Sequence, residues 1–510
     1  MNLLKTIFLV LPLFYCCTKA QPAILVGEVP MTPISNLQLF PQKVQIPDKF
    51  KGMAGVSDMT VNLPEGWTAS LYYANTSLLK KPRFMAWSPD SVLHISDISS
   101  GRILALRDIN NDGAADTAVT VASNIFANSI EFYNGALYAA QEFDVLKLTD
   151  ENGDGIYEKT TVFIKDIPGN GGHYTRTITF DKANKKMYLS IGSSCNICRE
   201  NNRSIIEEYN DDGTGKRTYA TGVRNAVGMT IHPVTGKLWA NNNGSDLQGE
   251  NIPPEWIDIV RENGFYGFPI AYHHQNYFNF AIGGYNSLLP ITAADSTRVR
   301  SMKLPGALVQ AHSAPMQMQF SNNSFPTDFQ NGAFVVLRGA WNTSQPNGSK
   351  PGYKVVYLRF DSPTDTIASS VTDLITGFQT AGGVWARPVG LAIDQKGNIY
   401  LGSDDLTKFI IKITPQKQTG INEENSFKSG SFTLSPNPAS GNILLKLPDS
   451  GFTNAAVEIF NILGEKIRQF TVNSAKTGNT FSTEGMTPGV YFCQVRYGTV
   501  TETKQFQIIR

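Results

Sequence analysis

The chain has 510 residues, of which 41 % are apolar and 17 % are charged, and its 44 lysines and arginines nearly balance its 43 aspartates and glutamates. A chain of this length is long enough for two or three domains with sizeable cores. The near-neutral charge argues against a nucleic-acid partner, which would require a basic surplus. Frequent glycine and scarce helical periodicity favour an all-β, loop-rich protein.

The first 20 residues have the pattern of an export signal. A lysine precedes a short apolar run at 7–15, and Thr18-Lys19-Ala20 offers a small-residue cleavage site. In an alternative interpretation, Cys16 or Cys17 carries a lipid. The apolar run is too short to span a bilayer, and no other segment is long and apolar enough, so we expect no membrane span.

A strand–turn–strand pattern recurs along the chain. Its copies start near residues 85, 130, 178, 229, 318 and 391. Most spacings are about 45 to 50 residues, the length of one four-stranded blade of a β-propeller. Two longer spacings indicate insertions. After an N-terminal extension at 21–60, the sequence therefore predicts a six-bladed β-propeller over 61–415, because a two-sheet sandwich would not repeat this pattern.

In a propeller, the residues just before the first strand of each blade meet at one mouth of the central channel. Here these positions are nearly all polar or cationic: Arg83, Asn128-Ser129, His173 with Arg176, Arg224-Asn225, His312-Ser313 and Arg387. Their convergence predicts one pocket for an anionic or polar ligand. Few carboxylates are among them.

Cys195-Asn196-Ile197-Cys198 is the one Cys-x-x-Cys motif of the chain. No second cysteine pair or histidine pair lies at a spacing suited to zinc. In an exported protein, a local disulfide between Cys195 and Cys198 that stiffens a loop is the simpler interpretation. A redox-active pair is the alternative.

Two loops carry oxygen ligands at alternate positions around a glycine turn, as calcium loops do. The ligand candidates are Asp108, Asn110, Asp112 and Asp116 in the first loop, and Asp150, Asn152, Asp154 and Glu158 in the second. No flanking helices are evident, so neither is an EF-hand. Structural calcium and a tight polar hairpin turn both explain the pattern.

Residues 416–430 are polar and predict a linker. The segment 431–510 predicts a small antiparallel, Ig-like β-sandwich. Ser435-Pro436-Asn437-Pro438-Ala439, the turn beginning at Phe460-Asn461 and Pro488-Gly489-Val490-Tyr491 make it resemble the C-terminal sorting domain of the type IX secretion system. The resemblance implies export by that machinery to the cell surface or the medium. A carbohydrate-binding sandwich is the alternative.

Four stretches make 61–415 resemble the PQQ-dependent sugar dehydrogenases, where PQQ is pyrroloquinoline quinone, and specifically their sorbosone-dehydrogenase branch. These stretches are Gly171–Arg176, Gly192–Cys198, Gly222–Gly228, and Ile252–Glu255 with Gly264–Pro269. The resemblance implies PQQ and calcium as cofactors and His173 as general base. A neutral imidazole suits the removal of a hydroxyl proton near neutral pH.

The resemblance also implies where the cofactors are held. Arginine binds carboxylates with two parallel hydrogen bonds, and PQQ carries three carboxylates. The candidate cofactor contacts are Arg224, Asn225, Arg338, Arg387, Arg176 and Trp385, the last standing where relatives carry a second arginine. Backbone carbonyls of Gly244 and Ser245 are the expected calcium ligands, and Arg83 and His312 are further pocket candidates.

These observations predict a secreted quinoprotein that oxidises a sugar, a sugar aldehyde such as sorbosone or a polyol, and passes electrons to an unidentified acceptor. A propeller that only binds a glycan or another surface ligand is the first alternative. A propeller hydrolase of the lactonase type is the second, and the scarcity of carboxylates at the mouth counts against it. No Ser-His-Asp elbow, phosphate loop or dinucleotide fingerprint occurs in the sequence.

Overall fold

The structure, a computed structural model, describes residues 31–416 except 54, 55, 57 and 345–347, and residues 432–509 except 448–453, 462–464, 474–478 and 498–499. The chain divides into two compact units, 1–417 and 418–510. The predicted export signal at 1–20 and nearly all of the predicted linker at 416–430 lie outside the described residues.

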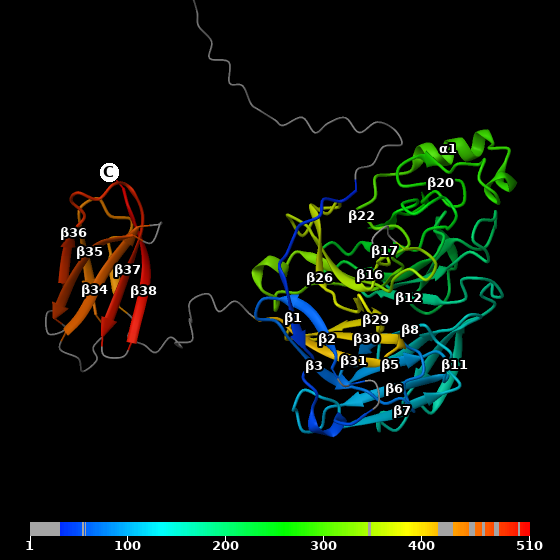
Figure 1. Ribbon diagram of the computed structural model, residues 1–510, viewed down its shortest axis with the longest axis horizontal. Coiled ribbons are helices and arrows are strands. Elements are labelled where there is room, and N and C mark those ends of the chain that lie inside the picture. The colour runs from blue at the N-terminus through cyan, green and yellow to red at the C-terminus, as the bar shows by residue number, and fades with distance from the viewer. Residues whose placement is uncertain are drawn as a thin grey trace, which may run out of the picture. The chain divides into compact units, whose positions relative to one another are not determined.

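Six sheets of four or five strands form the first unit (Figure 1). The first sheet contains β4 (Pro82–Trp87), β5 (Leu93–Asp97), β6 (Arg102–Arg107) and β7 (Thr117–Ser123). The second contains β8 (Ser129–Tyr133), β9 (Ala136–Ala140), β10 (Val145–Thr149) and β11 (Lys159–Ile164). The third contains β12 (Arg176–Asp181), β13 (Lys186–Ile191), β14 (Ile205–Asn210), β15 (Arg217–Thr221) and β19 (Gly264–Phe265).

The other three sheets follow the same antiparallel order. The fourth contains β16 (Ala226–Ile231), β17 (Leu238–Asn242), β18 (Glu255–Ile259) and β22 (Ala307–Val309). The fifth contains β23 (Pro315–Phe320), β24 (Gly332–Leu337), β25 (Lys354–Arg359) and β26 (Ser370–Ile375). The sixth contains β29 (Ala386–Ile393), β30 (Ile399–Leu406), β31 (Phe409–Thr414) and β3 (Thr68–Tyr73). Each of the six strands predicted to open a repeat is therefore the first strand of a sheet.

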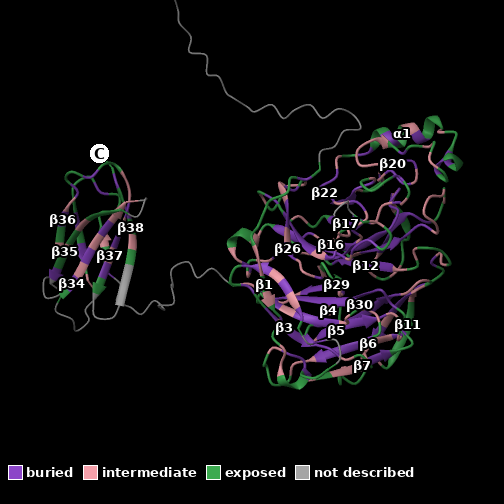
Figure 2. Ribbon diagram, viewed as in Figure 1, coloured by how far each residue is buried: buried purple, intermediate pink, exposed green. Residues whose placement is uncertain are grey.

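Local sequence explains the hairpins within these sheets. Asn134-Gly135 joins β8 to β9 with φ values of 46° and 77°. Positive φ at both residues is the requirement of a two-residue turn whose twist matches that of the flanking strands, and Asn-Gly meets it best. Buried apolar side chains then alternate into the neighbouring sheets, and Figure 2 shows β5 and β12 buried along their length.

Each first strand contacts the first strands of two other sheets. The contacts run in the order β4, β8, β12, β16, β23 and β29, and β29 contacts β4. The sixth sheet is completed by β3 from the beginning of the unit, which pairs with β31 so that Thr68 lies opposite Thr414. The sequence did not predict this pairing of two distant strands.

The fourth sheet carries the long insertion that the repeat spacing predicted. Between β18 and β22 lie β19, β20 (Ala271–Tyr272), β21 (Asn276–Tyr277), the 3-10 helix η2 (Tyr285–Leu288) and the helix α1 (Ala293–Ser301). The helix begins with a capping box, in which Thr292 accepts from the Asp295 N–H and Asp295 accepts from the Thr292 N–H. This helix was not predicted.

Short elements complete the unit. They are β1 (Leu39–Lys43) paired with β2 (Thr60–Pro64), β27 (Gln379–Thr380) paired with β28 (Gly383–Val384), and the 3-10 helices η1 (Asp48–Phe50) and η3 (Thr327–Phe329). No helix in the described parts of the chain is long and apolar enough to cross a membrane.

Two antiparallel sheets around one apolar core form the second unit. One sheet contains β32 (Thr433–Ser435), β33 (Asn442–Lys446) and β36 (Asn479–Ser482). The other contains β35 (Lys466–Asn473), β34 (Asn454–Asn461), β37 (Gly489–Tyr497) and β38 (Val500–Ile508). Asn437, from the predicted Pro-Asn-Pro motif, donates to the Gln505 carbonyl and accepts from the Gln507 N–H, which ties the start of this unit to its last strand.

Candidate functional site

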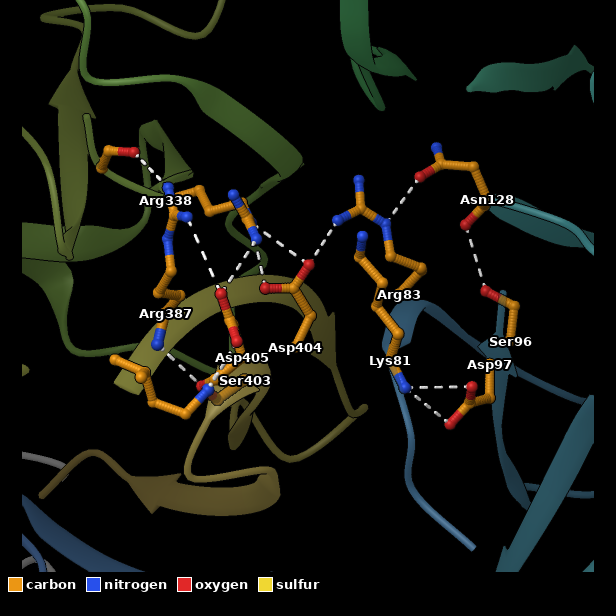
Figure 3. A network of polar contacts seen from close by, with 12 residues as sticks. Lys81, Arg83, Ser96, Asp97, Asn128, Arg338, Arg387, Ser403, Asp404 and Asp405 are labelled. Carbon is orange, nitrogen blue, oxygen red and sulfur yellow. Dashed lines mark hydrogen bonds and ion pairs between the residues drawn. The ribbon is translucent and has the colours of Figure 1, made fainter. Parts of the chain in front are cut away.

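Three arginines from three sheets surround the carboxylates of Asp404 and Asp405 (Figure 3). The Arg83 Nη1 donates to Asp404 Oδ2 at 2.6 Å, and the Arg338 Nε donates to Asp404 Oδ1 at 2.9 Å. Arg387 donates from Nη2 to the Gly339 carbonyl at 2.6 Å. Burial, and next the charge of Arg338, lower the pKa of Arg387.

Only part of the hydrogen-bonding capacity of Arg338 is used. Its Nε is bound to Asp404, whereas its Nη2 lies 3.9 Å from Asp405 Oδ2 and its Nη1 has no hydrogen bond to another described residue. With three arginines against two aspartates, the group retains a positive charge. An anionic ligand fits such a group, since guanidinium forks bind carboxylates in pairs of hydrogen bonds.

His173 lies in the loop before β12, and its Nδ1 is 2.7 Å from the Ser193 carbonyl oxygen and 2.9 Å from the Ser193 hydroxyl. A carbonyl only accepts, so Nδ1 carries the proton and Nε2 keeps its lone pair. Burial, and next the charge of Arg224, lower the pKa of His173 to about 4. The imidazole is therefore neutral at physiological pH.

Arg176 stabilises this loop by hydrogen bonds to its backbone carbonyls. Its side chain is fully buried, and it donates to the carbonyls of His173 at 2.8 Å, Thr175 at 3.0 Å and Pro168 at 2.5 Å. These bonds occupy both of its Nη atoms, so the described contacts of Arg176 are to the protein backbone. Its predicted contact with a cofactor stays a prediction.

Arg224 and Asn225 stand just before β16, beside His173. Gly192 lies between Asn225 and His173. A Cβ on Gly192 would lie 2.6 Å from Asn225 Oδ1 and 2.7 Å from His173 Cβ. Arg224 is buried, and it donates to the carbonyls of Asn196 at 3.0 Å and Asn243 at 3.2 Å. Only glycine allows this close approach of the two predicted site residues.

Asp246 connects His312 to Arg224. Its Oδ1 lies 3.5 Å from His312 Nδ1, and its Oδ2 lies 3.9 Å from Arg224 Nη2. The hydrogen bond with His312 is the main reason that the pKa of Asp246 is lowered and that of His312 is raised.

The polar contacts form a continuous circuit through all six sheets. Asn128 joins Arg83 to the Arg176 carbonyl, and Ser193 joins His173 to the Arg224 carbonyl. Asn243 accepts from Arg224 and donates to the Pro315 carbonyl, while the Arg338 N–H donates to the Ala314 carbonyl. The predicted mouth residues Arg83, His173, Arg224, His312 and Arg387 therefore lie at one end of the six sheets.

Trp385 directly precedes β29 and packs against backbone and aromatic groups. Its indole N–H donates to the Gly377 carbonyl at 2.6 Å, and its ring is stacked on Phe409 with 5.6 Å between centroids. Its described contacts are those of a packing residue.

Gly244 and Ser245 follow β17 at the same end. The Gly244 N–H donates to Glu255 at 2.5 Å, and the Tyr285 hydroxyl donates to the Ser245 hydroxyl at 2.8 Å. No hydrogen bond among the described residues uses the carbonyl oxygen of Gly244 or of Ser245. Burial raises the pKa of Glu255 to about 7.

The two aspartate-rich loops differ in one respect. In the first, Lys49 Nζ lies 2.6 Å from Asp116, 3.2 Å from Asp112 and 2.9 Å from the Ala114 carbonyl, so an ammonium group occupies the cation position. In the second, oxygens of Asp150, Asp154 and Glu158 lie within 4.8 Å of one another.

Cys195 and Cys198 form a disulfide in the structure.

Few carboxylates occur at the positions before the first strands, but others lie at the same end of the sheets. Asp404, Asp246 and Glu255 contact the residues of this site, and the sequence did not predict a role for Asp404 or Glu255. These residues could have been found from the topology. The second strand of each sheet runs antiparallel to the first, so it ends at the same end of the sheet at which the first strand begins. Asp404, Arg338, Asn243 and Ser193 all lie at such ends.

The six sheets and their shared polar end define a mostly β, propeller-like protein with a cation-rich site. The chain belongs to the family described as TrAA12-like, whose profile matches residues 61–415. It is thus homologous to the PQQ-dependent sugar dehydrogenases, as its motifs predicted. Residues 433–509 match the secretion system C-terminal sorting domain, which confirms the predicted type IX tail.

Three relatives illustrate this membership. A pyrroloquinoline quinone-dependent sugar dehydrogenase of Hypocrea jecorina is 22 % identical over 396 residues, covering 68 % of this chain and 88 % of the relative. A calcium structure of the family AA12 protein of Trichoderma reesei has a TM-score of 0.57 at 20 % identity, over 69 % of this chain and 96 % of that one. The holo PQQ domain of pyranose dehydrogenase from Coprinopsis cinerea has a TM-score of 0.56 at 22 % identity, over 69 % and 97 %. The two structures share the fold.

Proposed function

We propose that this protein is an exported quinoprotein dehydrogenase that oxidises a sugar, a sorbosone-like sugar aldehyde or a polyol, using PQQ and calcium. The observation that carries the proposal is the circuit of polar contacts that brings His173, Arg224 and Arg338 to one end of the six sheets. Membership of the TrAA12-like family and the names of its relatives support the same chemistry.

The cation-rich site fits an anion with several carboxylates. Arg338 has unused N–H groups on both Nη atoms, and Arg224 and Arg387 each have donors beyond those bound to carbonyls. We assign Arg224, Arg338 and Arg387, with the amide of Asn225, to PQQ. Since the acceptors of Arg224 and Arg387 are neutral carbonyls, these arginines are oriented without losing their positive charge.

The carbonyl oxygens of Gly244 and Ser245 fit a calcium ion, which prefers oxygen ligands. Both lack a hydrogen-bond donor among the described residues, and Asp246, whose pKa is lowered mainly by its hydrogen bond with His312, adds negative charge next to them. When bound, PQQ supplies the acceptor for hydride and calcium polarises its quinone carbonyl.

His173 is the proposed general base. Its Nδ1–H is held by Ser193, so Nε2 is the atom that takes the proton of the substrate hydroxyl. Arg176 fixes the carbonyl of His173 and so the entry of its loop into β12. Both contacts limit the imidazole to one orientation, which is what proton transfer in a fixed geometry requires.

We further propose that the six sheets are the blades of a closed propeller. The cyclic contacts of the first strands and the pairing of β3 with β31 support closure. The sixth sheet then contains β3 from the beginning of the unit and β29 to β31 from its end, and the hydrogen bonds between β3 and β31 close the ring of sheets.

Export is proposed to proceed in two steps, through a signal peptide at 1–20 and then through the type IX machinery, which the tail at 433–509 addresses. An electron acceptor outside the chain would receive the electrons.

A propeller that only binds a glycan is the main alternative. The lactonase-type alternative loses its earlier objection, because carboxylates do lie at the mouth. Asp404, however, is bound to both Arg83 and Arg338, so this carboxylate is neutralised by cations instead of being free for a metal.

Adding PQQ and calcium to the purified apoprotein tests the proposal. We expect saturable PQQ binding and reduction of a dye with aldoses, sorbosone or polyols as substrates. Tight binding of a glycan without any binding of PQQ would favour the alternative, and Arg338→Gln should weaken PQQ binding as a control on where it binds.

A further inference from the structure

The loop between β13 and β14 places Asn196 between the two disulfide-bonded cysteines, and Asn196 contacts two parts of the candidate site. Its carbonyl oxygen accepts from Arg224 Nε at 3.0 Å, and its Oδ1 accepts from Arg224 Nη2 at 2.9 Å. The same Oδ1 accepts from the Asp246 N–H at 2.8 Å, and its Nδ2 donates to the Asp246 carbonyl at 3.2 Å. One asparagine therefore accepts two hydrogen bonds from one edge of the Arg224 guanidinium and is itself hydrogen-bonded to the backbone of Asp246 in the next sheet's loop.

These contacts determine how Arg224 is presented. The guanidinium is buried, and burial lowers its pKa, so its position depends on hydrogen bonds that compensate for lost water. Asn196 supplies two of the three described hydrogen bonds, and Asn243 supplies the third. All three acceptors are uncharged, and the Asp246 carboxylate lies 3.9 Å from Nη2, beyond hydrogen-bond distance, so Arg224 is oriented with N–H groups left for an anion.

The disulfide limits the backbone conformations that are open to Asn196. Cys195 and Cys198 close a ring that contains only Asn196 and Ile197 between them. The Cys195 carbonyl also accepts from the Ser193 hydroxyl at 2.7 Å, and Ser193 in turn holds His173. A loop outside any strand would otherwise sample many backbone conformations.

We propose that Asn196 is a positioning residue that orients Arg224 for PQQ, and that the Cys195–Cys198 bond holds Asn196 in place. The inference rests on the proposed function, because it requires Arg224 to contact PQQ. It assigns to the cysteine pair the role of a support for the cofactor site.

The test measures the PQQ dissociation constant of the full-length apoprotein in saturating calcium. Asn196→Ala removes the hydrogen bond between Oδ1 and Arg224 Nη2. The loss of one hydrogen bond to a charged group should raise this constant about tenfold. The rate at saturating PQQ should return to that of the native protein, because His173 is held by other contacts. Asn201→Ala, in the exposed part of the same loop, is the matched control and should leave binding unchanged.

A double-mutant cycle separates positioning from general damage. Arg224→Ala should weaken PQQ binding, and Asn196→Ala should add nothing further in that background. The Cys195→Ser/Cys198→Ser variant should weaken binding in the same direction, and it carries the test should Asn196→Ala fail to fold.

Native affinity in both Asn196→Ala and the cysteine variant, with weakened binding in Arg224→Ala, would overturn the inference alone. Full additivity of the Asn196 and Arg224 substitutions would overturn it as well. Native affinity in Arg224→Ala would instead show that the proposed function assigns Arg224 wrongly.

Discussion

Arg83 and Asp404 form a buried ion pair between the first and the sixth sheet, with 2.6 Å between Nη1 and Oδ2. Asp404 also accepts from Arg338 of the fifth sheet, so one carboxylate compensates two cations. Burial lowers the pKa of Arg83, and the charge of Asp404 opposes this shift.

Removal of this carboxylate should destabilise the apoprotein. Asp404→Asn leaves Arg83 buried without a counter-charge, and breaking a buried pair in this way costs about 3 to 5 kcal/mol of unfolding free energy. Urea denaturation of the two-unit chain, monitored by the tryptophans of the first unit, measures the effect. Asp405→Asn is the matched control, because Asp405 is half-exposed and its ion-pair distances are 3.9 Å, so a change of less than about 0.5 kcal/mol is expected. Equal losses in both variants would contradict this account.

Replacing His173 should slow turnover without preventing PQQ binding. We expect His173→Gln to lower kcat by about a hundredfold to ten-thousandfold, the usual contribution of a general base. His232→Gln, at a histidine beyond the opposite end of β16 from Arg224, should keep the native rate. A His173→Gln enzyme with native kcat would exclude the imidazole as the base.

The protonation state of His173 gives a prediction about pH. Burial and Arg224 lower its pKa to about 4, so its imidazole signal in NMR spectra of the apoprotein should not titrate between pH 7.5 and 5. His173→Gln identifies the signal. A midpoint near the ordinary value of 6.5 would show that the imidazole is not shielded as described.

The same shift makes stability depend on pH. Between pH 6.5 and about 4 the unfolded chain binds a proton at this histidine and the folded apoprotein does not. The unfolding free energy contributed by His173 is therefore fully present above pH 6.5 and falls as the pH is lowered through this window. His173→Gln should remove this part of the slope in urea titrations at several pH values.

The strands of the six sheets could be predicted from the sequence, but the closure of the last sheet could not. Alternating apolar residues and turns such as Asn134-Gly135 are local signals. The pairing of Thr68 with Thr414 joins residues far apart in the chain, and no local pattern encodes it. Helix α1 was missed for a related reason, since its nine residues include only Val299 as a buried apolar side chain.

The candidate site was predictable where it lies before a first strand. The repeat itself marked Arg83, His173 and Arg224. Asp404 and Asn196 were missed as site residues, because their importance comes from contacts with arginines of other sheets. Lys49 was missed because it reaches the loop of Asp116 from a part of the chain that the repeat does not include.

Lys49 leads to a prediction about the two aspartate-rich loops. We expect the loop of Asp150, Asp154 and Glu158 to bind calcium and the loop of Asp112 and Asp116 not to, because an ammonium group already fills the latter. Equilibrium dialysis should find one calcium ion fewer bound to Asp154→Ala than to the native protein. Asp112→Ala should bind the native number, and a loss of calcium from that variant would contradict the role of Lys49.

The central claim is that PQQ lies at the shared end of the six sheets, beside His173. A crystal structure of the full chain with PQQ and calcium tests it most directly. We predict that the carboxylates of PQQ contact Arg224, Arg338 and Arg387, with the quinone within reach of His173 Nε2. A cofactor bound elsewhere, or a site that remains empty at saturating PQQ, would contradict the claim.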